Sequence, residues 1–217
     1  MAEVAIGAVL SIVIGVALGA VYLASKPVAT VKEIPKDAPA GAVYYIEGAH
    51  DTGKAVQAGE KLTTLAGGGS VTMTEEELNT LVGQPGKAAA PAAPVKPGEK
   101  PPPPPPAAHA VEPGPLNFRI HDGLLQIGSP VRLSLFGLDA KVIVQTRGSL
   151  VKRGNGVAYE PAVAYVGGCP LQRIPVVGPA VMKWLLVPKP VPEAIAAAWS
   201  KVADASIDGA TLRLTAQ

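Results

Sequence analysis

The chain has 217 residues and an almost balanced charge, with 19 Lys and Arg against 17 Asp and Glu. This balance leaves no large excess of basic or acidic charge of the kind that binds nucleic acid or selects an oppositely charged partner. A single cysteine, Cys169, excludes an intramolecular disulfide and a cysteine-rich zinc site, and the histidines are too far apart for an HExxH-type zinc motif. We therefore expect no metal, no cofactor and no nucleic-acid partner.

Residues 1–25 are predicted to form a transmembrane anchor. Val4–Ala24 contains 21 residues without a charge, and at about 1.5 Å rise per residue a helix of this length spans the hydrocarbon core of a bilayer. A cleaved signal peptide is the main alternative. Signal peptides begin with a basic segment, whereas this chain begins Met-Ala-Glu. A retained single-pass anchor is the favoured interpretation.

Small residues recur every four positions along this segment, at Gly7, Ser11, Gly15 and Gly19. Such a stripe lets two helix backbones approach closely, so it is a candidate helix–helix contact with a membrane partner or a second copy. The alternative is that small residues are simply common in membrane helices. The lysines that follow the anchor, Lys26, Lys32 and Lys36, would by themselves favour a cytoplasmic body.

Residues 26–69 are predicted to form a juxtamembrane connector, with a short strand at Ala42–Ile46 and a helix over Thr52–Ala66. Between them, the stretch EGAHDTGKAV matches seven of the eight positions of a phosphate-binding P-loop. Ala55 stands where a P-loop needs Ser or Thr to bind magnesium, and the remaining strands show an antiparallel pattern. We therefore expect no nucleotide.

Residues 70–82 are predicted to form a strand and a short helix that belong to the globular domain. Thr74 begins the sequence T-E-E-E, in which the Thr74 hydroxyl and the Glu77 carboxylate can cap the helix reciprocally. Glu75 and Glu76 would then lie in the first turn, where the helix dipole favours acids. This explanation competes with an acid–base or metal-binding role for the three glutamates, and we prefer it.

Residues 83–115 form a linker rich in Pro and Ala, with six consecutive prolines at 101–106. Such a tract adopts a polyproline II helix and acts as a stiff spacer. A ligand for a proline-reading domain is the alternative function.

Residues 116–217 are predicted to form an antiparallel sheet with packed short helices, which makes the fold class α+β. Apolar and polar residues alternate in several segments, and Asp122-Gly123, Asn155-Gly156 and Asp208-Gly209 are hairpin signals. One helix is expected over 179–187 and a second over 192–204, where Ile195, Ala198, Trp199 and Val202 would form an apolar face.

Two groups in this region have chemical potential. Cys169 could act as a nucleophile only with a base beside it, and His121 is the one histidine available in the sheet. A small packed residue is the preferred interpretation of this cysteine. Lys152 and Arg153, with Arg147 nearby, form a basic hairpin end that could touch anionic headgroups. A solvated turn is the preferred alternative.

The order of these segments resembles the YpmS-like bacterial envelope proteins, a single-pass family of unknown function. The resemblance rests on the N-terminal apolar helix, TMTEEELNTL, SLFGLDAKVIV and VAYEPAVAYVGGCPLQRIP, and it covers 70–82 and 116–217. It implies an α+β domain outside the cytoplasm, anchored in the cytoplasmic (inner) membrane of a bacterium.

These observations predict a membrane-anchored, non-enzymatic accessory or binding domain for lipid or another apolar ligand, held under the helices at 179–187 and 192–204. The alternative is a structural subunit or scaffold that associates through the glycine stripe of the anchor. An enzyme that uses Cys169 is a third hypothesis.

Overall fold

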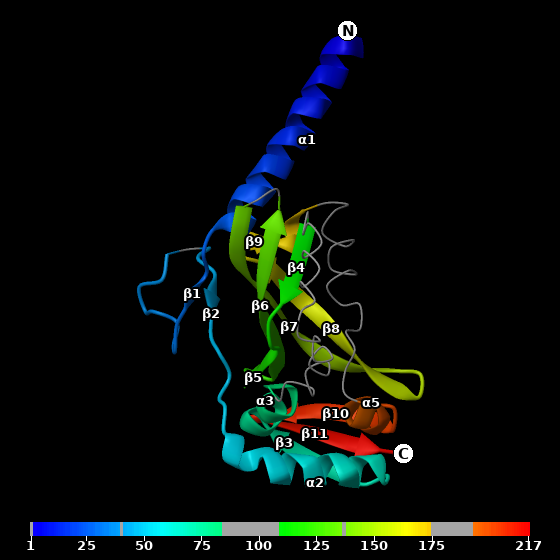
Figure 1. The fold of residues 1–217 in the computed structure, drawn as a ribbon. Coiled ribbons are helices and arrows are strands. Elements are labelled where there is room, and N and C mark those ends of the chain that lie inside the picture. Colours follow the sequence, from blue (N-terminus) through cyan, green and yellow to red (C-terminus); the bar gives the residue numbers. More distant parts are fainter. Residues whose placement is uncertain (1, 40, 84–108, 136–137, 175–192) are drawn as a thin grey trace, which may run out of the picture.

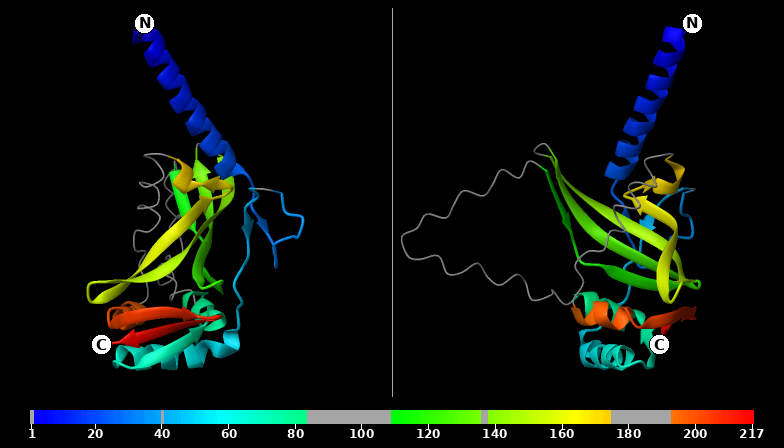
Figure 2. Two further views of the ribbon diagram at one scale, coloured as in Figure 1. Left: turned by 180° about the vertical axis from the view of Figure 1, so that it is seen from behind. Right: turned by 90° about the vertical axis from the view of Figure 1, so that its right-hand side faces the viewer.

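The computed structural model describes residues 2–39, 41–83, 109–135, 138–174 and 193–217 (Figure 1). Helix α1 (Ala2–Ser25) projects from one end of a long curved sheet, and a smaller α+β module lies at the other end (Figure 2). The α+β class with antiparallel sheets is therefore confirmed. The predicted proline-rich tract and the helix predicted over 179–187 lie outside the described residues.

The large sheet contains the long strands of the chain. Its order is β4-β6-β7-β8-β9, with β5 also paired to β6, and every pairing is antiparallel. The strands are β4 (His109–Pro113), β5 (Asn117–His121), β6 (Leu124–Leu135), β7 (Leu138–Arg153), β8 (Gly156–Val166) and β9 (Cys169–Pro170).

Tight turns join the strands where the hairpin signals predict them, except that one turn begins one residue earlier than predicted. Asp122 and Gly123 both have positive φ, 53° and 70°, as the two central positions of a type I′ turn require. The next turn uses Gly154 and Asn155, because Arg153 pairs with Gly156. The prediction of Asn155-Gly156 was therefore one residue late, and Gly154 supplies the positive φ of 59°.

The smaller module combines a three-stranded sheet with short helices. Its strands are β3 (Ser70–Thr74), β10 (Val202–Asp208) and β11 (Thr211–Ala216), in the order β10-β11-β3. The helical segments around it are η1 (Thr52–Lys54), α2 (Ala55–Ala66), α3 (Glu75–Gly83) and α5 (Glu193–Trp199), while η2 (Leu171–Arg173) follows β9.

Helix α5 is shorter than the sequence pattern suggested. It ends at Trp199, and Val202 begins strand β10 instead of extending the apolar face of a helix. Ala198 is fully buried, but Trp199 is 40% exposed. The prediction of a helix to residue 204 was wrong from Ser200 onward, because Val202–Asp208 forms a strand that pairs with β11.

One hydrophobic core joins the small module to the lower end of the large sheet. Ile120 of β5 and Leu125 of β6 pack with residues of all three small-sheet strands and of α2 and α5. Leu65 of α2 is 1% exposed, so the segment expected as a connector supplies part of the core. The buried residues of this core are Leu65, Val71, Met73, Ile120, Leu125, Ala198, Val202, Leu212 and Leu214.

The predicted capping box of α3 is confirmed. The Thr74 backbone N–H donates to Glu77 Oε2 at 2.8 Å, and the Glu77 N–H approaches Thr74 Oγ1 at 3.5 Å. Glu77 is 1% exposed, and Lys61 Nζ of α2 lies 2.6 Å from its Oε1. This buried pair ties α2 to the start of α3.

The C-terminal end of α1 rests on the turn between β8 and β9. The Gly168 N–H donates to the Leu23 carbonyl at 3.0 Å, and a Cβ on Gly167 would overlap the Ala24 backbone. Gly167 also has a positive φ of 56°. The V-G-G-C-P motif therefore forms the seat of the helix. Among the described residues, no helix has both the length and the apolar character that a membrane span requires.

Candidate functional site

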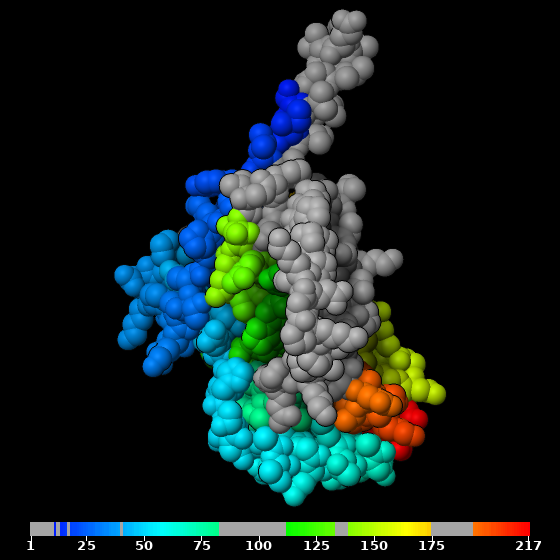
Figure 3. All heavy atoms as spheres, in the orientation of Figure 1, coloured from blue at the N-terminus to red at the C-terminus, as the bar shows by residue number. Residues whose placement is uncertain are grey.

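An extended segment, residues 42–51, crosses one face of the large sheet on its way from α1 to α2. We call it the crossing segment. It contains β2 (Tyr44–Tyr45), which pairs in parallel with β1 (Ala29–Thr30). Figure 3 shows the blue N-terminal chain lying beside the green strands. The short strand predicted at Ala42–Ile46 is thus present as two residues.

Two glutamines of the long strands β6 and β7 hold the crossing segment on the sheet. Gln145 Nε2 of β7 donates to the Tyr44 carbonyl at 3.1 Å, and Gln126 Nε2 of β6 donates to the Ile46 carbonyl at 3.2 Å. Both glutamines are 5% exposed. Buried amides need partners, and here the main chain of the crossing segment supplies them.

Tyr45 fixes the same segment by packing. Its side chain is 1% exposed and its ring lies over Gly128, where a Cβ would overlap it. Gly128 pairs with Gln145 across β6 and β7, so the ring and the two amides belong to one face of the sheet.

A cavity of about 320 Å³ lies beside this crossing, between residues 34–44 and strands β6, β7 and β8. Its size is at the lower end of the range of small-molecule sites. Apolar side chains from both walls share the lining with two amides, two phenols and one guanidinium. The described lining residues are Ile34, Ala38, Ala42, Val43, Tyr44, Gln126, Gln145, Thr146, Arg147, Val163 and Tyr165.

Arg147 carries the one charge among the described residues that line this cavity. Its side chain is half-buried, and no carboxylate in the described part of the chain forms an ion pair with it. It pairs across the sheet with Gln126 on one side and Val163 on the other. The arrangement can bind a small ligand that combines apolar and hydrogen-bonding groups.

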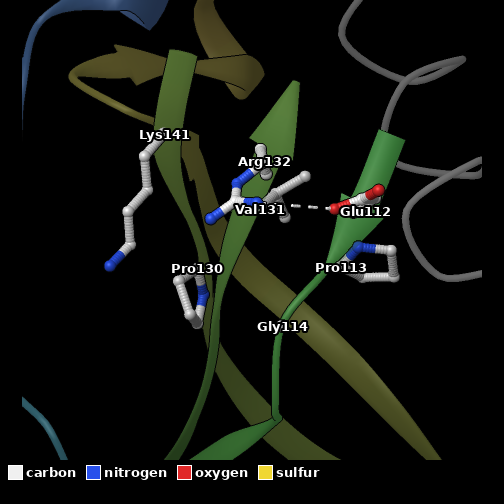
Figure 4. A pocket seen from close by; sticks show the side chains of 7 residues that line it. All are labelled: Glu112, Pro113, Gly114, Pro130, Val131, Arg132 and Lys141. Carbon is white, nitrogen blue, oxygen red and sulfur yellow. Dashed lines mark ion pairs between the residues drawn. The ribbon is translucent and has the colours of Figure 1, made fainter. Parts of the chain in front are cut away.

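A second cavity, of about 300 Å³, lies where β4 separates from β6 (Figure 4). Its lining includes Glu112, Arg132 and Lys141, and Arg132 Nη1 lies 3.9 Å from Glu112 Oε2. Both members of this pair are about two-thirds exposed, 69% and 66%. Such a solvated pair contributes little energy and selects no ligand.

Cys169 and His121 are not brought together. Cys169 is 2% exposed in β9, beside the seat of α1, whereas His121 ends β5 next to the small module (Figure 1). Burial raises the pKa of the Cys169 thiol, which disfavours the thiolate that a nucleophile needs. In the described ranges, no group of three His, Cys, Asp or Glu is arranged to hold a metal ion.

The stretch that resembles a P-loop has structural contacts throughout. Gly48 packs where a Cβ would overlap the Phe118 carbonyl, and Asp51 Oδ1 accepts from the Gly53 N–H at 2.9 Å at the start of η1. Lys54 Nζ lies 3.4 Å from Glu76 Oε2. The glycines therefore serve close packing and a helix start.

Glu75 also has a structural partner on each side. Its Oε1 accepts from the Ala49 N–H at 2.6 Å, and its Oε2 accepts from the Ile120 N–H at 2.8 Å. The three glutamates of α3 thus bind the crossing segment, Lys54 and Lys61 respectively. Hydrogen bonds from Thr74 and Lys54 lower the pKa of Glu76.

The remaining predicted residues lie apart. Lys152 and Arg153 are exposed at the β7–β8 hairpin, whereas Arg147 is five residues, about 17 Å, back along β7 in the cavity wall. Gly7, Ser11, Gly15 and Gly19 all belong to α1. A Cβ at Gly15 or Gly19 would meet nothing within 4 Å, so this face of the helix is open.

The sequence reading missed Gln126, Gln145 and Tyr45 as organisers of the site. For Gln126, a visible signal was an uncharged amide between two apolar residues, Leu125 and Ile127. Comparison of the chain with protein-family models, with curated proteins and with solved structures gave no match. The resemblance to the YpmS-like proteins stays a prediction.

Proposed function

We propose that this chain is a membrane-anchored, non-enzymatic binding protein that holds an apolar ligand such as a lipid. The observation that carries the proposal is the cavity of about 320 Å³ between the connector and the large sheet, with apolar side chains on both walls. This location replaces the one expected under the helices at 179–187 and 192–204. The first of those lies outside the described residues, and the second is the short α5.

The anchor is α1. Val4–Ala24 has no charged residue and is long enough to span a bilayer. In the half of α1 nearer the body, large apolar side chains are exposed, and a helix in water avoids such exposure. Lys26 Nζ lies 5.1 Å from the centroid of the Tyr22 ring. Aromatic and lysine side chains at a helix end are typical of the membrane–water interface. The exposed residues are Ile14, Val16, Leu18, Val21, Tyr22 and Leu23.

We place the body outside the cytoplasm, on the cytoplasmic membrane of a bacterium. The support is the resemblance to the YpmS-like envelope proteins, against the lysines after α1. A cysteine accessibility test on intact cells decides the matter: Ser206→Cys, on an exposed strand position in a Cys169→Ser background, should react with a membrane-impermeant maleimide. Reaction only after lysis would place the body in the cytoplasm.

The test of binding is native mass spectrometry of the full chain purified from a membrane-containing host, with extraction and identification of any adduct. We expect a stoichiometric ligand-sized adduct. Val163→Trp, which fills the cavity from a half-buried strand position, should abolish it. Ala158→Trp, half-buried on the same strand and outside both the cavity lining and the hydrophobic core, is the matched control. A ligand-free mass for the unaltered chain would contradict the proposal.

A structural subunit or scaffold is the second candidate, and the open small-residue face of α1 at Gly15 and Gly19 favours it. Replacing both glycines with Leu should abolish self-association or capture of a partner in membranes, as read by crosslinking. The same double variant should still carry the ligand adduct that native mass spectrometry detects. Loss of the adduct instead of the association would count against a scaffold.

A further inference from the structure

We propose that the ligand of the cavity beside the crossing segment is an anionic single-chain amphiphile whose head binds Arg147. This inference rests on the proposed function and specifies the chemistry of its ligand. It follows from the charge, the donor geometry and the size of the cavity.

The charge of the lining is the first argument. Arg147 is the single ionised side chain among the described lining residues, and it has no carboxylate partner in the described chain. A guanidinium that is half-buried beside apolar side chains lacks part of its hydration, so an anion that enters is favoured by charge and by hydrogen bonds.

The donors around the cavity are the second argument. Gln126 and Gln145 each already donate to a carbonyl of the crossing segment, whereas Arg147 offers a planar fork of N–H groups. Such a fork matches a carboxylate or phosphate bidentately. Gln126 lies directly opposite Arg147 on β6, and Val163 lies opposite it on β8. The head therefore has a polar neighbour on one side and an apolar neighbour on the other.

Size and lining define the rest of the ligand. At about 10–15 Å³ for each water-sized unit, the cavity of about 320 Å³ holds about 20–30 such units, which is enough for a twelve-carbon chain with its head. That volume suits one short chain and not two full acyl chains. Val43 and Val163 supply apolar contact, and the 55% exposed Ile34 lies at the solvent side.

The experiment uses the full chain in nanodiscs of phosphatidylcholine and a dodecanoic acid that carries a photoreactive diazirine on its terminal carbon. Covalently labelled peptides are mapped by mass spectrometry. Dodecanoic acid, dodecanol and dodecyl phosphate are each added as a competitor of the labelling. They share one chain, so the comparison with dodecanol tests the charge of the head, and the comparison of the two anions distinguishes a carboxylate from a phosphate.

We expect labelling in residues 34–46 or 145–165, and competition by either anion about tenfold or more stronger than by dodecanol, because hydrogen bonds to charged groups contribute about 1.5–3 kcal/mol. Arg147→Gln should remove this preference for anions. Arg153→Gln, an exposed arginine on the same strand, should retain it.

Val163→Asp provides a second variant that keeps the arginine. The new carboxylate would lie opposite Arg147 across the strands and pair with it, so labelling by the anionic probe should fall while the far-ultraviolet circular dichroism stays unchanged. Equal competition by dodecanol and dodecanoic acid, with Arg147→Gln unaffected, would overturn the anionic ligand and leave the apolar site intact. Absence of label from the cavity peptides would overturn both.

Discussion

Asn79 of α3 binds both backbone groups of Phe118 in β5, as a neighbouring strand would. Its Oδ1 accepts from the Phe118 N–H at 2.6 Å, and its Nδ2 donates to the Phe118 carbonyl at 2.8 Å. The same Nδ2 donates to the Ala49 carbonyl at 3.0 Å. One fully buried amide thus connects the small module, the large sheet and the crossing segment.

Asn79→Ala should destabilise the protein by about 2–4 kcal/mol, because it leaves backbone groups of Phe118 and Ala49 buried without partners. Chemical denaturation of the full chain in detergent measures the change. Asn155→Ala, at an exposed turn, should cost about 0.5 kcal/mol or less. An equal loss of unfolding free energy in the two variants would contradict a stabilising role for the hydrogen bonds of Asn79.

Lys61→Ala should cost about 2–3 kcal/mol. The substitution leaves the Glu77 carboxylate, 1% exposed, without the ammonium that lies 2.6 Å away. Lys54→Ala is the matched control, since its pair with Glu76 is about one-third exposed on both sides, 33% and 31%, and such pairs contribute about 1 kcal/mol at most. A larger loss for Lys54→Ala would contradict the ranking by burial.

Gly167→Ala should release the end of α1 from its seat. The added Cβ would overlap the Ala24 backbone, and the positive φ of 56° disfavours any side chain. Hydrogen exchange at the Gly168 amide, which donates to Leu23, should become faster by tenfold or more if about 1.4 kcal/mol of local stability is lost. Gly209→Ala has a similar positive φ with open space around it, and it should leave that amide protected.

Stability should fall as the pH rises from about 10 to about 12. Burial raises the pKa of Tyr45 to about 12 and that of Tyr159 to about 12, from 10.0 in the unfolded chain. The folded state holds these two phenol protons more tightly than the unfolded state does. Their contribution to the free energy of unfolding is therefore complete below pH 10 and is lost as the pH approaches 12. Denaturation across this range should show a shallower fall for Tyr159→Phe, and an unchanged slope would contradict the assignment.

The elements that the sequence predicted well are those that local rules decide. The capping box at Thr74 and Glu77 and the hairpin at Asp122-Gly123 depend on residues a few positions apart, and both are confirmed. The end of α5 was misplaced because Val202 suits either period, and pairing with β11 decides between them.

The site could not be predicted in the same way. Gln145 and Tyr44 are 101 positions apart, and Gln126 and Ile46 are 80 apart, so no local pattern relates them. A glycine such as Gly128 is explained only when the Tyr45 ring above it is known. The cavity exists because these distant contacts hold the crossing segment at the sheet.

The attachment of the crossing segment along the sheet has a mechanical consequence. Strand β7 has 16 residues and extends about 50 Å from the end near α1 to the small module. A free coil of the same connector, residues 26–51, would average roughly 28 Å between its ends and vary widely. If α1 lies in a bilayer, as we propose, the attached connector acts as a rigid support and holds the far module at a fixed height above the membrane.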